Sequence, residues 1–124
     1  MKTEIRYIER KTDSSDRGLA WIARVGFSQS RRTIYFNDMA LKATKGGLVG
    51  GNHLDPKTGD VYWITGVKKQ EWNRHWAGGG NIMIERTLHD WYVDFVNFNE
   101  MGFLEIIEDL PIPEVDQFHR EENS

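Results

Sequence analysis

Short runs of alternating apolar and polar residues fill most of the first two-thirds of the chain, and turn residues separate them. The clearest runs are 19–27, where every second residue from Trp21 is apolar, and 61–67, where Tyr62 and Ile64 face away from their neighbours. This period of two is typical of β-strands with two different faces. Further strands are predicted at 5–9, 33–36, 39–44, 81–85 and 103–107, with a short one ending near residue 54.

Two turn signals connect these predicted strands. Asn37-Asp38 fits a two-residue hairpin loop, because Asn and Asp tolerate the positive φ of a type I′ turn. Asp55-Pro56-Lys57-Thr58-Gly59 supplies Pro to fix φ and Gly to adopt φ > 0. Connections of hairpin length favour antiparallel pairing over strand–helix–strand units. We therefore predict a mostly β (α+β) fold: a small antiparallel β-barrel or sandwich of about five to seven strands plus one C-terminal helix.

Apolar residues take helical spacing after the last of these strand runs. Thr87 is a predicted N-cap, and Asp90 favours the positive end of a helix. Gly102 is a natural stop, so we predict a helix at about 87–101. Its apolar stripe consists of Leu88, Trp91, Tyr92, Phe95 and Val96.

A chain of 124 residues with 39% hydrophobic residues fits one folded domain. We predict a single domain over residues 1–109 and an acidic, poorly ordered tail over 110–124. Charge is distributed unevenly: residues 1–86 carry 15 Lys and Arg against 9 Asp and Glu (+6), and residues 87–124 carry 1 against 10 (−9). Such asymmetry is found in proteins with a basic binding face, although an acidic surface also serves solubility.

Localisation and redox class follow from what the sequence lacks. No run reaches the ~18 apolar residues of a membrane span, and the N-terminus has no apolar signal segment. The chain contains no cysteine, which excludes disulfides, thiolate metal ligands and a thiol nucleophile. We expect a cytoplasmic protein.

The segment 68–80 combines cations with flat aromatic rings. Lys68, Lys69 and Arg74 are candidates for holding phosphate oxygens. Trp76, and with it Trp72, offers a stacking surface worth about 1–3 kcal/mol per base. The structural alternative is that these indoles close the end of the barrel as part of its core.

Glycines and hydrogen-bonding side chains complete this candidate ligand site. Gly78, Gly79 and Gly80 would let backbone N–H groups approach an anion, or would serve a tight turn. Asn52, which follows a second glycine-rich stretch, and His75 would supply directional hydrogen bonds. No phosphate-loop or dinucleotide fingerprint is present, and we predict no cofactor.

Two histidines provide an alternative chemistry. His53 and His75 are predicted at the ends of adjacent strands, and with a cation they would suit metal-independent cleavage of RNA. A zinc site would need a third ligand such as Asp55 or Asp60, and no zinc-ligand spacing is present, so we predict no metal. The non-catalytic alternative is that both histidines only make hydrogen bonds.

Three segments together resemble a family of small, uncharacterised bacterial proteins: "GLAWIARVGFSQSRRTIYFND", "KGGLVGGNHLDPKTGDVYWITGVKK" and "RHWAGGGNIMIE". The resemblance covers about residues 9–86. Some members carry the name 1-deoxy-D-xylulose-5-phosphate synthase, a large thiamine-diphosphate enzyme whose cofactor motif has no counterpart here, and we treat that name as a misannotation. The resemblance implies no established catalytic residues.

These observations favour a non-enzymatic binding module. Its expected ligand is a phosphate-bearing molecule, either a nucleotide or single-stranded nucleic acid, and no membrane partner is expected. The first alternative is an RNase-like enzyme that uses His53 and His75. The second is a protein–protein interaction domain with an acidic C-terminal surface.

Overall fold

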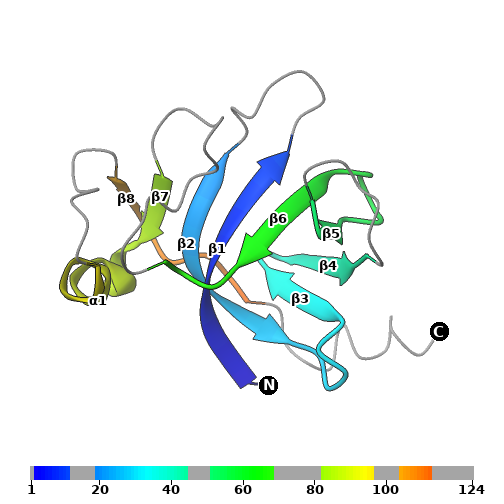
Figure 1. Ribbon diagram of the computed structural model, residues 1–124, viewed down its shortest axis with the longest axis horizontal. Coiled ribbons are helices and arrows are strands. Elements are labelled where there is room, and N and C mark those ends of the chain that lie inside the picture. Colours follow the sequence, from blue (N-terminus) through cyan, green and yellow to red (C-terminus); the bar gives the residue numbers. More distant parts are fainter. Residues whose placement is uncertain (1, 12–18, 45–50, 69–81, 97–103, 113–124) are drawn as a thin grey trace.

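Six antiparallel strands close into a β-barrel in the computed structural model, which describes residues 2–11, 19–44, 51–68, 82–96 and 104–112 (Figure 1). Neighbours around the barrel follow the order β1-β6-β5-β4-β3-β2, and β2 pairs with β1 to close it. The prediction of a small, mostly β antiparallel barrel with one C-terminal helix is therefore confirmed. The strands are β1 (Lys2–Lys11), β2 (Ala20–Phe27), β3 (Thr33–Phe36), β4 (Met39–Ala43), β5 (His53–Leu54) and β6 (Val61–Thr65).

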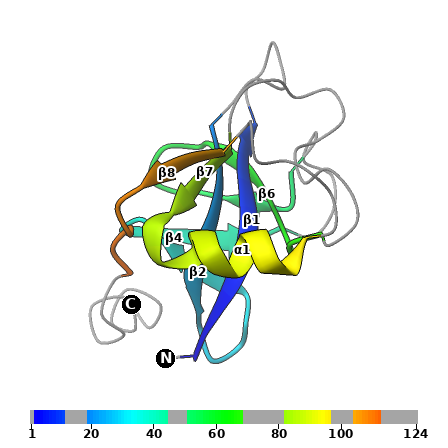
Figure 2. The ribbon, with the colours of Figure 1, turned by 90° about the vertical axis from the view of Figure 1, so that its left-hand side faces the viewer.

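Two further strands, β7 (Ile82–Glu85) and β8 (Leu104–Ile107), extend the sheet on one side of the barrel. β7 pairs with β2 and β8 pairs with β7, and both pairings are parallel. The expectation of antiparallel pairing throughout is wrong here. A helix lies between β7 and β8 in the chain, and such a crossover returns the second strand in the same direction (Figure 2).

The helical segment begins with the 3₁₀ turn η1 (Arg86–Leu88) and continues as α1 (His89–Phe95). It is shorter than the predicted range 87–101, because Val96 already has an extended backbone. Thr87 is not a side-chain N-cap: its hydroxyl donates to Asp109 (2.7 Å) and its N–H donates to the same carboxylate (3.1 Å). The acceptor at this helix start is thus supplied from the C-terminal segment.

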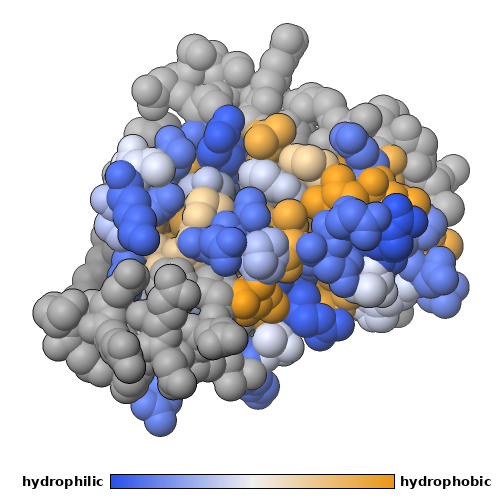
Figure 3. All heavy atoms as spheres, turned by 180° about the vertical axis from the view of Figure 1, so that it is seen from behind, coloured by the Kyte–Doolittle hydropathy of each residue, from blue (hydrophilic) through white to orange (hydrophobic). Residues whose placement is uncertain are grey.

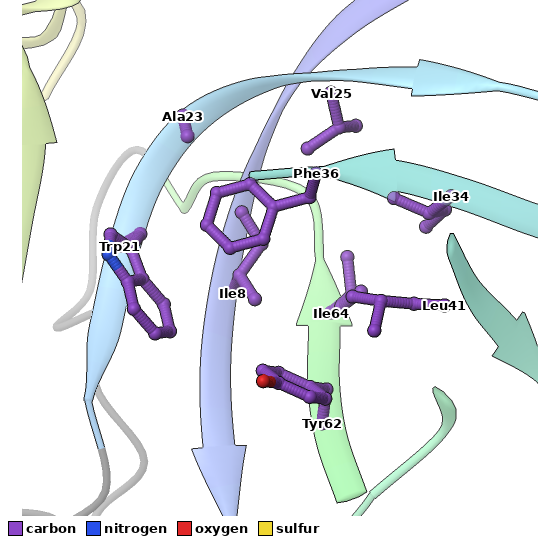
Figure 4. Close-up of a cluster of buried hydrophobic side chains, with 9 residues drawn as sticks. All are labelled: Ile8, Trp21, Ala23, Val25, Ile34, Phe36, Leu41, Tyr62 and Ile64. Atoms are coloured by element: carbon purple, nitrogen blue, oxygen red, sulfur yellow. The ribbon is translucent and has the colours of Figure 1, made fainter. Parts of the chain in front are cut away.

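Two apolar clusters stabilise this arrangement. The first fills the barrel with the inward-facing residues of its strands, among them the predicted alternating residues of β2 (Figure 4). The second lies outside the barrel, between β1, β2, β7 and α1, and includes Tyr7, Ile22 and Tyr92. β2 therefore buries both of its faces along its first half, which explains why Ala20 and Ile22 are fully buried.

Both predicted turns are present. Asn37 and Asp38 have φ of 50° and 60°, as in a type I′ hairpin, and Gly59 has φ of 81°. We expect Asp38→Gly to stabilise the fold by about 0.5–1 kcal/mol, because Asn-Gly suits a type I′ turn better than Asn-Asp. Chemical unfolding would measure this change. Asp38→Ala removes the same charge without freeing φ, and a gain of similar size in that variant would contradict the explanation.

The chain beyond β8 packs back on the barrel. Leu110 contacts the interior cluster, and the Pro111 carbonyl accepts from the Asp38 N–H (3.4 Å). Residues 113–124, most of the predicted acidic tail, lie outside the described residues. Apolar residues gather on the face shown in Figure 3 toward the side where β7, β8 and α1 lie, and exposed Ile106 belongs to β8. No helix within the described ranges is long and apolar enough to cross a membrane.

Candidate functional site

One end of the barrel carries a row of four residues in register on adjacent strands, which we call the rim row: Leu19, Arg10, Tyr62 and His53. Tyr62 is paired with Arg10 on one side and with His53 on the other. The Arg10 N–H donates to the Leu19 carbonyl (2.8 Å), which extends the row to the start of β2. Paired residues of antiparallel strands share a face, so these side chains lie on the interior face of the barrel at its rim.

Two connections that carry predicted site residues reach the barrel at this end: the one between Thr44 and Gly51 with both of its ends, and the one after Lys68 only where it enters β7 at Ile82. Ile82, the first residue of β7, lies beside the start of β2, since the next pair is Trp21 with Met83. The Thr44 N–H donates to the Asn52 carbonyl (3.0 Å), which joins the two ends of the glycine-rich connection. Binding residues are often held on loops by a rigid scaffold, and this rim has that organisation.

A β-bulge shapes the rim at Asn52. His53 is paired with Tyr62, and the Asn52 N–H also donates to the Tyr62 carbonyl (2.9 Å). Two successive residues therefore face one residue of β6. Bulges occur frequently at barrel rims and beside active sites, where they redirect a side chain.

The Asn52 side chain binds the backbone of β6 rather than pointing freely into solvent. Its Nδ2 donates to the Ile64 carbonyl (2.7 Å), and its Oδ1 accepts from the Ile64 N–H (2.9 Å). The same Oδ1 lies 2.7 Å from His53 Nδ1. Asn52 thus holds the His53 ring, and its predicted hydrogen bonding is directed mainly at the protein itself.

The two titratable rings of the rim row are shifted toward their neutral forms. Burial lowers the pKa of His53 below its ordinary value of 6.5. Burial, and after it the charge of Asp60, raises the pKa of Tyr62, while Arg10 opposes that shift. At neutral pH the row therefore presents a cation and a neutral imidazole, with the neutral Tyr62 phenol buried between them.

The remaining predicted residues are not brought to the rim by the described chain. Lys68 is exposed and follows the other end of β6, three residues after Thr65. The other predicted ligand contacts lie outside the described residues: Lys69, Trp72, Arg74, His75, Trp76, Gly78, Gly79 and Gly80. The predicted proximity of His53 and His75 stays a prediction for the same reason.

Sequence reasoning missed Arg10, Leu19 and Tyr62 as site candidates. Each belongs to an ordinary strand pattern, and only the strand register aligns them. The one signal in the sequence is that Arg10 interrupts the inward-facing positions of β1, after Ile8. A cation at an inward position close to a strand end is typical of a barrel rim, where its head reaches water.

The outer face of β1 carries a separate polar cluster. The Tyr7 hydroxyl and the Lys11 ammonium both donate to the Glu9 carboxylate, and Glu9 is fully buried. These contacts compensate the buried charge. Trp63, which is paired with Glu9 across β6, is 36% exposed beside this cluster.

A second group of cations lies at the opposite end of the barrel. Arg31 and Arg6 lie over the Phe27 ring, with guanidinium carbons 4.1 Å and 5.3 Å from its centre. Both also bind Glu4, at 2.6 Å and 3.2 Å. The hydrogen bond from Arg31 is the main cause that lowers the pKa of Glu4. Shared pairing with Glu4 and Phe27 gives these arginines a structural role.

The rim row offers a guanidinium, an apolar side chain and an imidazole to a ligand. The Tyr62 ring belongs to the buried interior cluster, and its hydroxyl donates to Met39 Sδ (3.5 Å). No group of three or more His, Asp or Glu side chains placed to hold a metal ion occurs in the part of the chain that the structure describes. A comparison of the chain with protein-family models, with curated proteins and with solved structures found no match.

Proposed function

We propose that the protein is a non-enzymatic binding module for a phosphate-bearing ligand, either a nucleotide or single-stranded nucleic acid, and that this ligand binds at the barrel rim. The observation that carries the proposal is the register of Arg10, Tyr62 and His53 on three adjacent strands. Arg10 forks onto phosphate oxygens, and His53 contacts the rest of the ligand, while the buried Tyr62 holds the two strands in register between them.

Architecture supports this assignment. Small barrels bind oligonucleotides on one side of the barrel through the strands and the loops that leave them. Here the connection from Thr44 to Gly51 ends at the rim, and the connection that carries Arg74 and Trp76 ends at Ile82, which lies at the same rim. The predicted cations and indoles of that connection would extend the phosphate and stacking contacts of the row.

Binding of labelled single-stranded RNA, single-stranded DNA and nucleotides, with EDTA and at two salt concentrations, tests the proposal. We expect Arg10→Gln to weaken binding about tenfold, because a charge-assisted hydrogen bond to phosphate is lost. The slope of log affinity against log salt should fall by about one for nucleic acid. Arg74→Ala and Trp76→Ala test the predicted extension in the same assay.

Arg24→Gln is the matched control. Arg24 is exposed, is paired with Ile5 and lies on the outer face of β2, so this variant removes the same charge away from the rim. Its affinity should stay within about twofold of wild type. Equal weakening in the Arg10 and Arg24 variants would show that net charge alone causes the effect. If none of the ligands binds at low salt, the proposal is overturned.

Cleavage is the second candidate activity, and the contact between His53 and Asn52 favours it, since a general base needs a group that orients it. The same RNA samples run on denaturing gels test for it. If wild type shortens the RNA and His53→Phe leaves it intact, the protein is a metal-independent RNase rather than a binding module. Intact RNA with a shifted native band supports binding alone.

A further inference from the structure

The Asn52 amide has only one orientation that fits the backbone of Ile64. The Ile64 N–H requires an acceptor and the Ile64 carbonyl requires a donor, so Oδ1 must face the first and Nδ2 the second. A flipped amide would oppose an N–H to an NH₂ and a carbonyl to a carbonyl. The backbone of Ile64 therefore fixes which terminal atom of the Asn52 amide is the oxygen and which is the nitrogen.

This orientation determines which ring nitrogen of His53 carries a proton. The 2.7 Å contact joins His53 Nδ1 to Asn52 Oδ1, and that oxygen can only accept. Nδ1 must then be the donor. In a neutral imidazole the other nitrogen, Nε2, is left with a lone pair, so it is an acceptor.

A rim acceptor cannot bind a phosphate group, whose oxygens are acceptors at neutral pH. It needs a ligand atom that donates a hydrogen bond. Arg10 and His53 lie two strands apart, about 10 Å between their α-carbons, which is a span that the side chains and one nucleotide can bridge. The 2′-hydroxyl is the donor that every ribonucleotide carries beside its phosphate, whatever its base.

We infer that the relay from the Ile64 backbone through Asn52 to His53 makes Nε2 of His53 the group that accepts a hydrogen bond from a ribose 2′-hydroxyl, and so selects ribonucleotides over deoxyribonucleotides. This inference rests on the proposed function for its ligand class. Arg10 supplies affinity through phosphate, and His53 supplies the distinction between the two sugars. Asn52 is a positioning residue, because it acts through His53.

The tautomer itself is tested without any ligand. Long-range ¹H–¹⁵N correlation spectra of the ¹⁵N-labelled full chain at pH 8, with the His53 signals identified by their loss in His53→Phe, should show a protonated Nδ1 and an unprotonated Nε2. A proton on Nε2 of neutral His53 would overturn the relay. This result stands even if no ligand binds.

Selectivity is tested with oligo(A) and oligo(dA) of equal length, which differ only in the 2′-hydroxyl. Wild type should bind the RNA about three- to tenfold more tightly, the effect of one net hydrogen bond. In His53→Phe that ratio should fall to about one. In wild type it should also fall on acidification below the pKa of His53, where Nε2 becomes a donor, and this measurement serves if the variant does not fold.

Each outcome separates the two proposals. Equal affinity of wild type for both oligonucleotides, or a ratio that persists in His53→Phe and at acid pH, would overturn the role of His53 while the phosphate site stands. If the RNA-to-DNA affinity ratio changes in Arg10→Gln and not in His53→Phe, Arg10 rather than His53 makes the selection, and the inference is overturned. Absence of binding to either oligonucleotide, with the tautomer as expected, would overturn the nucleic-acid form of the proposed function and the 2′-hydroxyl selection with it, and would leave only the relay from Asn52 to His53.

Discussion

Gly51→Ala should destabilise the protein by about 2–3 kcal/mol, because the bulge has no room for a methyl group at this position. A Cβ on Gly51 would lie 2.1 Å from Val61 Cγ1 and 2.9 Å from the Tyr62 carbonyl oxygen. The valine side chain can rotate, but that oxygen is a backbone atom that already accepts from the Asn52 N–H. Relief of the second contact therefore requires a backbone shift, and forced overpacking costs about 1–3 kcal/mol. Urea unfolding of wild type and variant would measure the difference.

Two further variants determine whether the contact itself is responsible. Gly66→Ala lies where an added Cβ has nothing within 4 Å, so its stability should stay within about 0.5 kcal/mol of wild type. Val61→Ala removes one of the two clashing atoms, so a double-mutant cycle with Gly51→Ala should show partial recovery. Equal losses for Gly51→Ala and Gly66→Ala would contradict the explanation. Since the bulge also sets the position of Asn52, any Gly51→Ala protein that folds should show a weaker RNA preference.

Local chemistry made much of the barrel predictable. The alternation in 19–27 identified the interior face of β2, because only one face of that alternation is apolar enough to fill a barrel. Asn37-Asp38 and the turn ending at Gly59 were identifiable because few residues tolerate positive φ. These features depend on neighbours in the sequence, and the structure confirms them.

Parallel pairing of β7 with β2 and the length of the helix were not predictable in the same way. Apolar and polar residues alternate only weakly in 82–85, because β7 packs between the barrel and the helix. This pattern therefore does not reveal which strand β7 joins. Thr87 is a residue type that often caps helices, but its hydroxyl binds the side chain of Asp109, which is distant in sequence, instead of the helix backbone. The rim row has the same origin, since register on three strands, rather than any motif, aligns Arg10, Tyr62 and His53.

Glu85 is the most consequential of these long-range contacts. β2 pairs with β7 at Trp21 and Ile22 and with β3 from Gly26 onward, so the Arg24 N–H faces the gap between the two neighbours. Glu85 Oε1 accepts from that N–H (2.5 Å), and Oε2 accepts from the Leu110 N–H (2.6 Å). One buried carboxylate thereby joins β2, β7 and the C-terminal segment.

Glu85→Ala should therefore cost about 2–4 kcal/mol of unfolding free energy, because two backbone donors lose their acceptor in a buried place. Glu85→Gln keeps one acceptor oxygen and should lose roughly half as much. Urea unfolding at pH 7 measures both. Glu105→Ala removes an exposed carboxylate from the neighbouring strand β8 and should change stability by less than about 0.5 kcal/mol, and a loss there as large as in Glu85→Ala would point to charge rather than to the hydrogen bonds.

The pH dependence of stability isolates the ionisation of Glu85. Burial raises the pKa of Glu85 above its ordinary 4.5, against the opposing effect of the two backbone N–H groups. The folded state therefore binds this proton more tightly than the unfolded state does. The stability that protonation of Glu85 contributes is complete below about pH 4.5 and is lost as pH rises through the higher folded-state pKa. The unfolding free energy of wild type relative to that of Glu85→Gln should accordingly fall across that window. A difference that rises with pH would show that the two hydrogen bonds, rather than burial, determine the pKa of Glu85.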